Sequence, residues 1–306
     1  MLRMIGALAL AGGARAARAA PREPEFAVPA GACDCHAHIY DQRFPYTPNA
    51  RLRPTGATVA DYRHEVQSAL KTSRAILVTP STYGTDNRCL TDALGQFAGA
   101  ARGVAVVSAD VEIAELRQLH AAGVRGVRVN LPKDQLIALS ARLHDMGWHL
   151  ELFVPSDKLV EMEETLLSLP IPIVLDHLAH LPEPDAVRSK GFKTVRKLLD
   201  SGRCWIKLSG AYIASRIGPP DYPDSSELAK AYIAAVPERC LWATNWPFPD
   251  ISAGPNPVPR PDSLPFLNLF GRWVSDADLR RQILVINPER FYGFEPAGAQ
   301  TEPSAP

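Results

Sequence analysis

The feature of this chain that most restricts its fold is a regular alternation of short apolar segments with longer amphipathic ones after residue 30. Runs such as Ala75-Ile76-Leu77-Val78 have the solid apolar character of parallel strands that are covered on both faces. The expected strands are 32–40, 75–78, 103–107, 124–131, 148–154, 171–178, 204–208 and 240–246. The expected helices are 57–71, 87–98, 112–122, 132–146, 156–169, 191–201, one starting near 225, and those within 265–288.

Eight β/α units in succession predict an α/β fold that consists of a single (β/α)8 TIM barrel over residues 31–293. An open, doubly wound sheet is the alternative. The GxGxxG turn with which such a sheet usually holds a nucleotide is absent from the sequence, which favours the barrel.

The composition is that of an ordinary globular protein. The chain has 306 residues, of which 46% are hydrophobic and 22% charged, and it is long enough to bury one large core. Its net charge is zero, so we expect no basic surface and no nucleic acid as a partner. Five cysteines, an odd number without the spacing of a disulfide framework, argue against a disulfide scaffold.

Both ends of the chain are expected to lie outside the barrel. Residues 1–30 combine a basic start, a short apolar stretch and small residues, which is typical of a secretory signal. This predicts a periplasmic or exported protein; a disordered leader on a cytoplasmic protein is the alternative. The apolar stretch is too short to span a bilayer, and no other run approaches that length. Residues 294–306 are rich in Pro, Ala and Gly and are expected to form a disordered tail.

His36 and His38 are two histidines one residue apart in the first expected strand. Residues i and i+2 of a strand point to the same face. Both imidazoles would therefore enter one space, as a metal ion or a polarised substrate oxygen requires. Cys33 and Cys35 would lie on the opposite face. A pair of buried, hydrogen-bonded structural histidines is the alternative.

The chemistry of such a barrel takes place at the C-terminal ends of its strands. The polar residues that the sequence puts there are His36, His38, Arg125, Arg128, Asp176, His177, His180, Ser209, Tyr212, Arg216, Thr244 and Asn245. Three of the histidines, His36, His38 and His177, would converge from two strands on one mouth of the barrel. This convergence is a more specific signal than any one of the three alone.

Several motifs occur together along the chain, namely HxH at 36–38, Asp176-His177, Leu208-Ser209-Gly210-Ala211-Tyr212 and Thr244-Asn245-Trp246-Pro247. In this ordered set the chain resembles the amidohydrolase superfamily over roughly residues 30–293. Within that superfamily it is most similar to the branch of 2-pyrone-4,6-dicarboxylate lactonase, 4-sulfomuconolactone hydrolase and D-galactarolactone isomerase. The resemblance implies an enzyme, a hydrolase of the lactonase type or a lactone isomerase, with a small lactone or carboxylate as its substrate.

The resemblance also implies individual roles. The implied catalytic residues are His36, His38, His177 and Asn245, and the implied substrate-binding residues are Tyr46, Ser81, Arg128 and Arg216. The histidines would polarise the substrate carbonyl, directly or through a metal, and the arginines would hold a substrate carboxylate. An ordinary surface ion pair is the alternative for each arginine. Arg128 is favoured over that alternative because its expected strand, 124–131, consists mainly of Val, Gly and Leu.

Two departures from the pattern of this branch bear on mechanism. Its hydrolases carry an aspartate in TDWPH on the last strand, whereas this chain has Asn245, and Phe248 replaces the histidine. An amide has no basic lone pair near neutral pH, so Asn245 cannot act as a general base, although it can form hydrogen bonds. The isomerase of the branch has asparagine at the matching position. A second arginine of the pyrone lactonases falls near Lys133 here, which makes a pyrone dicarboxylate a poor candidate substrate.

No cofactor is expected to be required; Zn²⁺ held by His36, His38 and His177 is the alternative. Asp176 would point away from His177 on a regular strand. Glu151 is the other carboxylate in an apolar strand, and a structural role is the first expectation for it.

Three functions remain open from the sequence. The first is a metal-independent enzyme that opens or rearranges a sugar-acid-type lactone. The second is a zinc-dependent hydrolase, and the third is an exported protein that binds small carboxylates without turning them over. The oligomeric state is not predicted.

Overall fold

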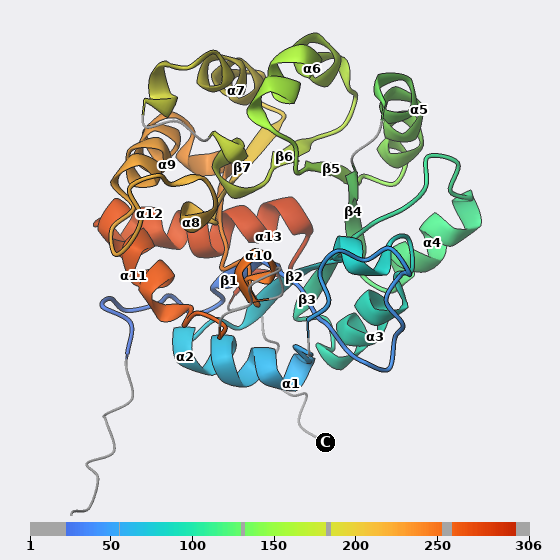
Figure 1. Cartoon of the computed structure of the whole chain (residues 1–306), viewed down its shortest axis with the longest axis horizontal. Coiled ribbons are helices and arrows are strands. Elements are labelled where there is room, and N and C mark those ends of the chain that lie inside the picture. The colour runs from blue at the N-terminus through green and yellow to red at the C-terminus, as the bar shows by residue number, and fades with distance from the viewer. Residues whose placement is uncertain (1–22, 55, 130–131, 182–184, 253–258, 298–306) are drawn as a thin grey trace, which may run out of the picture.

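The structure, a computed structural model, describes residues 23–54, 56–129, 132–181, 185–252 and 259–297 and is built around one eight-stranded parallel sheet. The strands are β1 Cys33–Ala37, β2 Arg74–Val78, β3 Ala101–Ala105, β4 Val124–Val129, β5 His149–Leu152, β6 Ile173–Leu175, β7 Cys204–Leu208 and β8 Cys240–Trp242. They pair in sequence order from β1 to β8, and helices surround them (Figure 1). The single (β/α)8 barrel predicted from the alternation is confirmed.

The helices follow the expected segments closely. Their bounds are α1 Val59–Tyr62, α2 Ser68–Leu70, α3 Arg88–Gln96, α4 Ile113–Ala121, α5 Lys133–His144, α6 Ser156–Ser168, α7 Lys190–Asp200, α8 Ala211–Ala214, α9 Pro223–Ala235, α10 Pro249–Ser252, α11 Leu264–Trp273, α12 Ala277–Arg281 and α13 Asn287–Tyr292. Short 3₁₀ or π segments are η1 Arg63–Gln67, η2 Ser81–Tyr83, η3 His177–His180, η4 Ala186–Arg188, η5 Pro237–Arg239 and η6 Gln282–Ile286. The short helices α8 and α10, which follow β7 and β8, were not predicted, since four residues give no periodic signal.

The barrel closes between its first and last strands. Beyond the end of β8, Asn245 N donates to His36 O at 2.9 Å, and His38 N donates to Trp246 O at 2.8 Å. The buried carboxylate of Asp34 lies beside this junction. It accepts hydrogen bonds from Thr244 N at 2.9 Å and from Thr244 Oγ1 at 2.6 Å. The junction of β1 and β8 is thus fixed by both backbone and side-chain bonds.

Alternate residues of the strands face two different apolar regions. Ile76 and Val104 belong to a small cluster in the barrel interior, which Tyr292 of α13 also joins. Their strand neighbours Leu77 and Ala105 belong to the larger cluster between the sheet and the helices. A barrel interior filled by side chains is a packed core and not a pore, so the space for a ligand lies at its end.

A bulge in β1 changes one expectation. The register with β2 shifts between Asp34 and Ala37, which leaves three residue steps opposite two. Alternation had predicted that Cys33 and Cys35 lie on the face opposite His36 and His38. Instead, both cysteines pack in the barrel interior. An extra residue in a strand lets neighbouring side chains turn to the same side.

The described part of the chain begins and ends against the barrel. Phe26 packs on Phe270 of α11, with ring centroids 6.4 Å apart, and Phe294 is buried in the interior cluster at the other end of the chain. Residues 1–22 of the expected leader and 298–306 of the expected tail lie outside the described residues. Within the described residues, no helix has the length and apolar character needed to cross a membrane. All five cysteines are free and buried.

Candidate active site at the C-terminal end of the barrel

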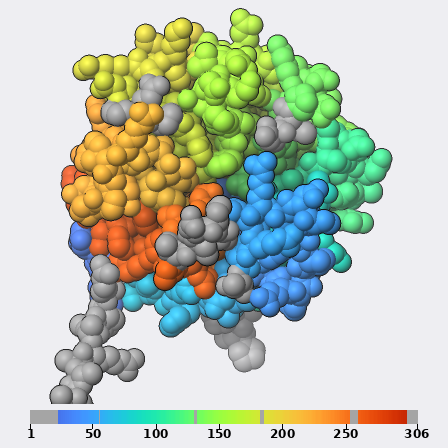
Figure 2. All heavy atoms as spheres, in the orientation of Figure 1, coloured from blue at the N-terminus to red at the C-terminus, as the bar shows by residue number. Residues whose placement is uncertain are grey.

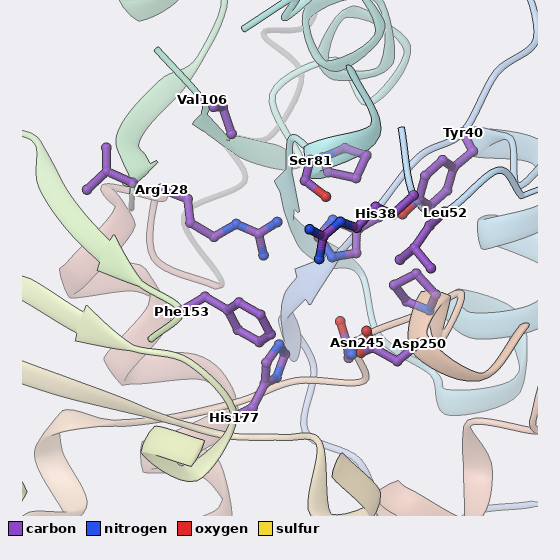
Figure 3. A pocket seen from close by; sticks show the side chains of 14 residues that line it. His38, Tyr40, Leu52, Ser81, Val106, Arg128, Phe153, His177, Asn245 and Asp250 are labelled. Atoms are coloured by element: carbon purple, nitrogen blue, oxygen red, sulfur yellow. The ribbon is translucent and has the colours of Figure 1, made fainter. Parts of the chain in front are cut away.

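A cavity of about 460 Å³ opens at the C-terminal ends of the strands. The residues that line it are His38, Tyr40, Arg51, Leu52, Pro80, Ser81, Val106, Arg128, Val129, Phe153, His177, Asn245, Pro249 and Asp250. In Figure 3, Arg128 and Phe153 lie on one side of it, and Asn245 and Asp250 on the other. Figure 2 shows the segment after β1 (blue) on one side of the middle of this face and the C-terminal part of the barrel (orange) on the other.

A chain of hydrogen bonds fixes the protons of the two histidines of HxH. His38 Nδ1 lies 2.7 Å from Val78 O, and a carbonyl only accepts, so this nitrogen carries the proton. His38 Nε2 must then accept from His36 Nε2, which lies 3.3 Å away. His36 Nδ1 in turn accepts from Lys207 Nζ at 2.9 Å. Neither histidine therefore has an N–H free to point at a substrate.

The low pKa values of these imidazoles agree with that assignment. Burial lowers the pKa of His38 to about 3, and the nearby Arg128 guanidinium acts in the same direction. Burial and the Lys207 ammonium hold the pKa of His36 well below its usual range. Both rings are therefore neutral near neutral pH, as the hydrogen-bond chain requires.

Lys207, in the middle of β7, is fully buried at the centre of the ionic residues below the cavity. Its ammonium donates to Glu151 Oε2 and to His36 Nδ1, and lies 3.3 Å from Asp176 Oδ1. Burial opposes its charge, but the two carboxylates outweigh burial and raise the pKa of Lys207. Lys207 thus forms two hydrogen bonds to buried acceptors and an ion pair with a third buried group, Asp176.

Two carboxylates share this one ammonium and respond differently. Burial opposes ionisation of Asp176, but the Lys207 ammonium outweighs it and holds the pKa of Asp176 well below its usual range. Burial and the negative charge of Asp176 raise the pKa of Glu151 to about 7. Two close acidic groups with one cation between them do not ionise equally, so Asp176 is the permanently charged member. The expected structural role for Glu151 fits this geometry, with a lysine as its partner.

His177 reaches the cavity through an unusual turn. β6 ends at Leu175, and all four residues of η3 have left-handed φ values, from 47° at His177 to 60° at Ala179. This conformation is costly for residues other than glycine and is found where surrounding structure enforces it. A Cβ added to Gly210 would lie 3.0 Å from His177 Cβ, so the loop after β7 packs directly on this ring. The turn lets Asp176 and His177 both face inward, contrary to the expectation for a regular strand.

His177 is the histidine of the cavity wall whose ring has a nitrogen available for a ligand. Its Nδ1 is bound to Ser209 Oγ at 2.8 Å. Burial keeps its pKa well below the usual range, so the ring is neutral. If the Ser209 hydroxyl donates to Nδ1, the proton of the ring sits on Nε2 and can be donated to a substrate oxygen.

Asn245 lies on the opposite side of the cavity, after β8. Its Nδ2 donates to Tyr212 Oη at 2.8 Å, and its Oδ1 is buried with no hydrogen-bond partner among the described residues. A buried amide oxygen without a partner is costly. It is therefore suited to accept a hydrogen bond from a ligand hydroxyl.

Arg128, from β4, brings a guanidinium into the cavity. Its Nη2 donates to Thr79 O at 3.4 Å, and its Nη1 lies 3.8 Å from Asp176 Oδ2. Its guanidinium also lies over the Phe153 ring, 5.7 Å from the centroid. These long contacts leave the planar fork available for a carboxylate.

The other residues implied by the resemblance lie at varying distances from the cavity. Ser81 lines it, whereas His36 lies below its floor, fully buried. Tyr46 is not among the lining residues, and its hydroxyl donates to Pro54 O at 2.8 Å. Arg216 is exposed and is also not among them; its backbone N–H donates to Asp224.

A metal site would need His36, Asp176 and His177, whose ligand atoms lie within 4.8 Å of one another. The hydrogen bonds do not favour such a site. The lone pair of His36 Nδ1 accepts a hydrogen bond from the Lys207 ammonium, and the Nε2 of His36 carries a proton that is donated to His38. A cation between these residues would have to displace Lys207 from both His36 and Asp176. The residues present therefore do not fit a metal ion in this arrangement.

Sequence reasoning missed three residues of this region, namely Lys207, Arg51 and Asp250. Lys207 was hidden in an apolar strand, although a lone lysine among Trp, Ile and Leu is itself a signal of a buried ionic partner. Arg51 and Asp250 come from segments in which sequence gives no period from which to place a side chain.

Comparison with known proteins identifies the family of the chain. The family model described as Amidohydrolase matches residues 33–294. A 2-pyrone-4,6-dicarboxylate hydrolase of Comamonas testosteroni is 32% identical over 290 residues, covering 89% of this chain and 93% of the relative. A D-galactarolactone isomerase of Agrobacterium fabrum is 29% identical over 286 residues, covering 90% and 96%. A crystal structure of an Agrobacterium tumefaciens protein superimposes with a TM-score of 0.79 at 26% identity, covering 89% of this chain and 99% of that one. The chain belongs to the amidohydrolase family.

Proposed function

We propose that this protein is a lactonase that acts on a small carboxylated lactone without a bound metal ion, with lactone isomerisation as the alternative reaction. The observation that carries the proposal is the meeting of Arg128, His177 and Asn245 in one cavity of an amidohydrolase barrel. The names of the relatives, a dicarboxylate hydrolase and a lactone isomerase among them, support the substrate class.

Arg128 and His177 have separate roles in this proposal. The Arg128 fork holds a substrate carboxylate, and Arg51 adds a second positive charge to the same cavity. The His177 Nε2–H donates to the lactone carbonyl. This bond strengthens as negative charge develops on that oxygen in the transition state, which is how such a donor accelerates acyl transfer. Ser209 keeps the ring in the required tautomer.

Asn245 provides recognition and not proton transfer. Its unpartnered Oδ1 accepts a hydrogen bond from a hydroxyl of the substrate. A site that holds a ring hydroxyl near the carbonyl favours attack by that hydroxyl, which rearranges the lactone. Attack by water at the same carbon opens the ring instead.

Lys207 is the reason for proposing that no metal takes part. Its ammonium provides a permanent positive charge under the cavity and occupies the lone pair of His36 that a metal ion would need. A zinc-dependent hydrolase is the second candidate, favoured by the approach of His36, Asp176 and His177. It requires a rearrangement of Lys207, which the first proposal does not.

Metal analysis of the purified full chain, combined with an assay on a panel of sugar-acid and other carboxylated lactones before and after chelation, tests the proposal. The expected result is turnover by protein with metal far below one equivalent, unchanged by the chelator. Stoichiometric zinc and activity lost to chelation would establish the second candidate. Ligand-induced stabilisation without any turnover would instead indicate a binding protein.

Export is proposed on the pattern of residues 1–20. Glu25 N donates to Asn268 Oδ1 at 3.0 Å and Phe26 packs on α11, so cleavage before residue 23 leaves these contacts of the barrel intact. Intact-mass measurement of the protein from the periplasm of an expressing bacterium tests this, with a shortened N-terminus as the expected result and full-length protein in the cytoplasm as the contrary one.

A further inference from the structure

We propose that Asp250 supplies the carboxylate base that Asn245 lacks, taking the proton from the water or substrate hydroxyl that attacks the lactone carbonyl. The inference rests on the proposed function and names a catalytic residue for it. Asn245 itself cannot take that proton, because an amide is not basic near neutral pH.

The position of Asp250 is the first observation. It lies in α10, five residues after Asn245, and it lines the cavity together with Arg128 and His177. In Figure 3 it appears on the same side of the cavity as Asn245, across from Arg128. A carboxylate displaced along the chain from the end of β8 thus reaches the same cavity.

The surroundings of Asp250 define where its charge acts. Its charge is felt by Tyr40 after β1, by Tyr212 of α8 and by His180 of η3, and it in turn feels Arg128 of β4. These groups belong to four different parts of the barrel mouth. Asp250 and Arg128 line the same cavity, where a substrate held by Arg128 would lie.

Asp250 is the one acidic residue among the described residues that line this cavity. Asp176 and Glu151 are fully buried below it and are bound to Lys207. In the part of the chain that the structure describes, no basic side chain forms an ion pair with Asp250. An acidic side chain that lines a cavity and forms no ion pair can accept a proton from a ligand.

The basicity of Asp250 suits the role. The side chain of Asp250 is exposed at the barrel mouth, yet desolvation by its neighbours raises the pKa of its carboxyl, although His180 and Arg128 act in the opposite direction. A carboxylate whose pKa is raised is a better base than an ordinary aspartate, which is the direction that general base catalysis near neutral pH requires.

The proposed step balances without an outside reagent. Asp250 takes the proton of the attacking O–H while that oxygen forms a bond to the carbonyl carbon, and the carbonyl electron pair moves to the oxygen held by His177. The ring C–O bond then breaks, and the departing oxygen receives the proton from Asp250. Attack by water yields a hydroxy acid; attack by a hydroxyl of the substrate yields an isomeric lactone.

The test compares four full-length proteins on whichever lactones the wild type turns over: wild type, Asp250→Asn, Asp250→Asn with Asn245→Asp, and Asp157→Asn. Asp157 is an exposed acid in the first turn of α6 and does not line the cavity, so its variant controls for loss of a surface charge near a helix start. We expect Asp250→Asn to lose about 100-fold or more in kcat, in keeping with general base catalysis. The double variant should recover part of this loss, and Asp157→Asn should match wild type.

The pH profile separates a base from a merely structural residue. Wild-type kcat/KM should fall on the acidic side with an apparent pKa above that of an ordinary aspartate, and this limb should be absent from the residual activity of Asp250→Asn. Activity of Asp250→Asn within threefold of wild type, or an unchanged acidic limb, would overturn the inference alone. Absence of turnover by wild type on every lactone would overturn the proposed function, and the role of Asp250 with it.

Discussion

Replacing Lys207 by methionine is the most direct test of the ionic cluster below the cavity. The substitution keeps the length of the side chain and removes the ammonium, which leaves Glu151 and Asp176 fully buried without their shared cation. Removing one partner of a buried ion pair costs about 3–5 kcal/mol, because the remaining charge stays desolvated. We expect Lys207→Met to lose that much of its free energy of unfolding at pH 8.

A double-mutant cycle with Glu151→Gln isolates the interaction. Glu151→Gln removes the carboxylate with the raised pKa and leaves Asp176 as the one acid beside Lys207. Combined with Lys207→Met, it removes opposite charges together, so the double variant should be more stable than the sum of the single losses predicts, by about 2 kcal/mol. Urea titrations followed by circular dichroism and tryptophan fluorescence give these free energies when the two probes coincide.

The effect of pH has a definite sign. The pKa of Glu151 in the folded protein is raised to about 7, above its unfolded value, so its protonated form favours the folded state at low pH and this contribution is lost as pH rises through the folded value. Without Lys207 that pKa rises further. Lys207→Met should therefore become less stable between pH 7 and pH 9, by up to about 1.4 kcal/mol per unit. A loss below about 1 kcal/mol, with single effects that simply add, would refute the reasoning.

Three further outcomes follow from named contacts. Arg128→Lys should raise KM about tenfold for a carboxylated lactone, through loss of the two-pronged contact, and leave KM for its methyl ester unchanged; steady-state kinetics on both compounds measures this, and equal effects would exclude carboxylate binding. Gly210→Ala should lower kcat because the added Cβ would press on His177. Gly202 also has a positive φ, 79°, but no atom lies within 4 Å of an added Cβ, so Gly202→Ala should lower stability alone. Measurements of kcat and of thermal unfolding separate the two effects, and equal kcat values would contradict the packing argument. Burial lowers the pKa of His149 to about 3, so between pH 6.5 and pH 3 the unfolded chain binds a proton on His149 that the folded protein does not. The free energy of unfolding of the wild type should therefore fall as pH drops through this range. His149→Leu should flatten that decline in urea titrations by up to about 1.4 kcal/mol per pH unit, and an unchanged slope would count against the burial argument.

The strands and the main helices could be predicted because periodicity reports burial directly. The succession of eight β/α units could be predicted without knowledge of tertiary contacts, and so could the helix ends before Gly123 and Gly147. The expected strand 171–178 is shortened to Ile173–Leu175, and 240–246 to Cys240–Trp242. Beyond those strand ends the chain turns inward to form the cavity. Some of the residues there are still apolar, so the sequence pattern predicted strands longer than those observed.

The directions of the site residues were harder to predict than their strands. Alternation alone cannot reveal the bulge in β1 that places Cys35 in the barrel interior. It also cannot reveal the left-handed turn through which Asp176 and His177 both face inward. Both depend on packing with other strands. Likewise, the protons on His36 are determined by Lys207, which is 171 residues away along the chain.

The junction of β1 and β8, fastened by Asp34, has a consequence for the order in which the protein folds. The junction joins segments some 210 residues apart, and such distant contacts are among the slowest to form because the intervening chain must first be ordered. The same junction fixes Asn245 against the backbone of His36. Catalytic competence should therefore appear only with the final closure of the barrel, so activity regained during refolding would report the last folding step and not the earlier formation of helices.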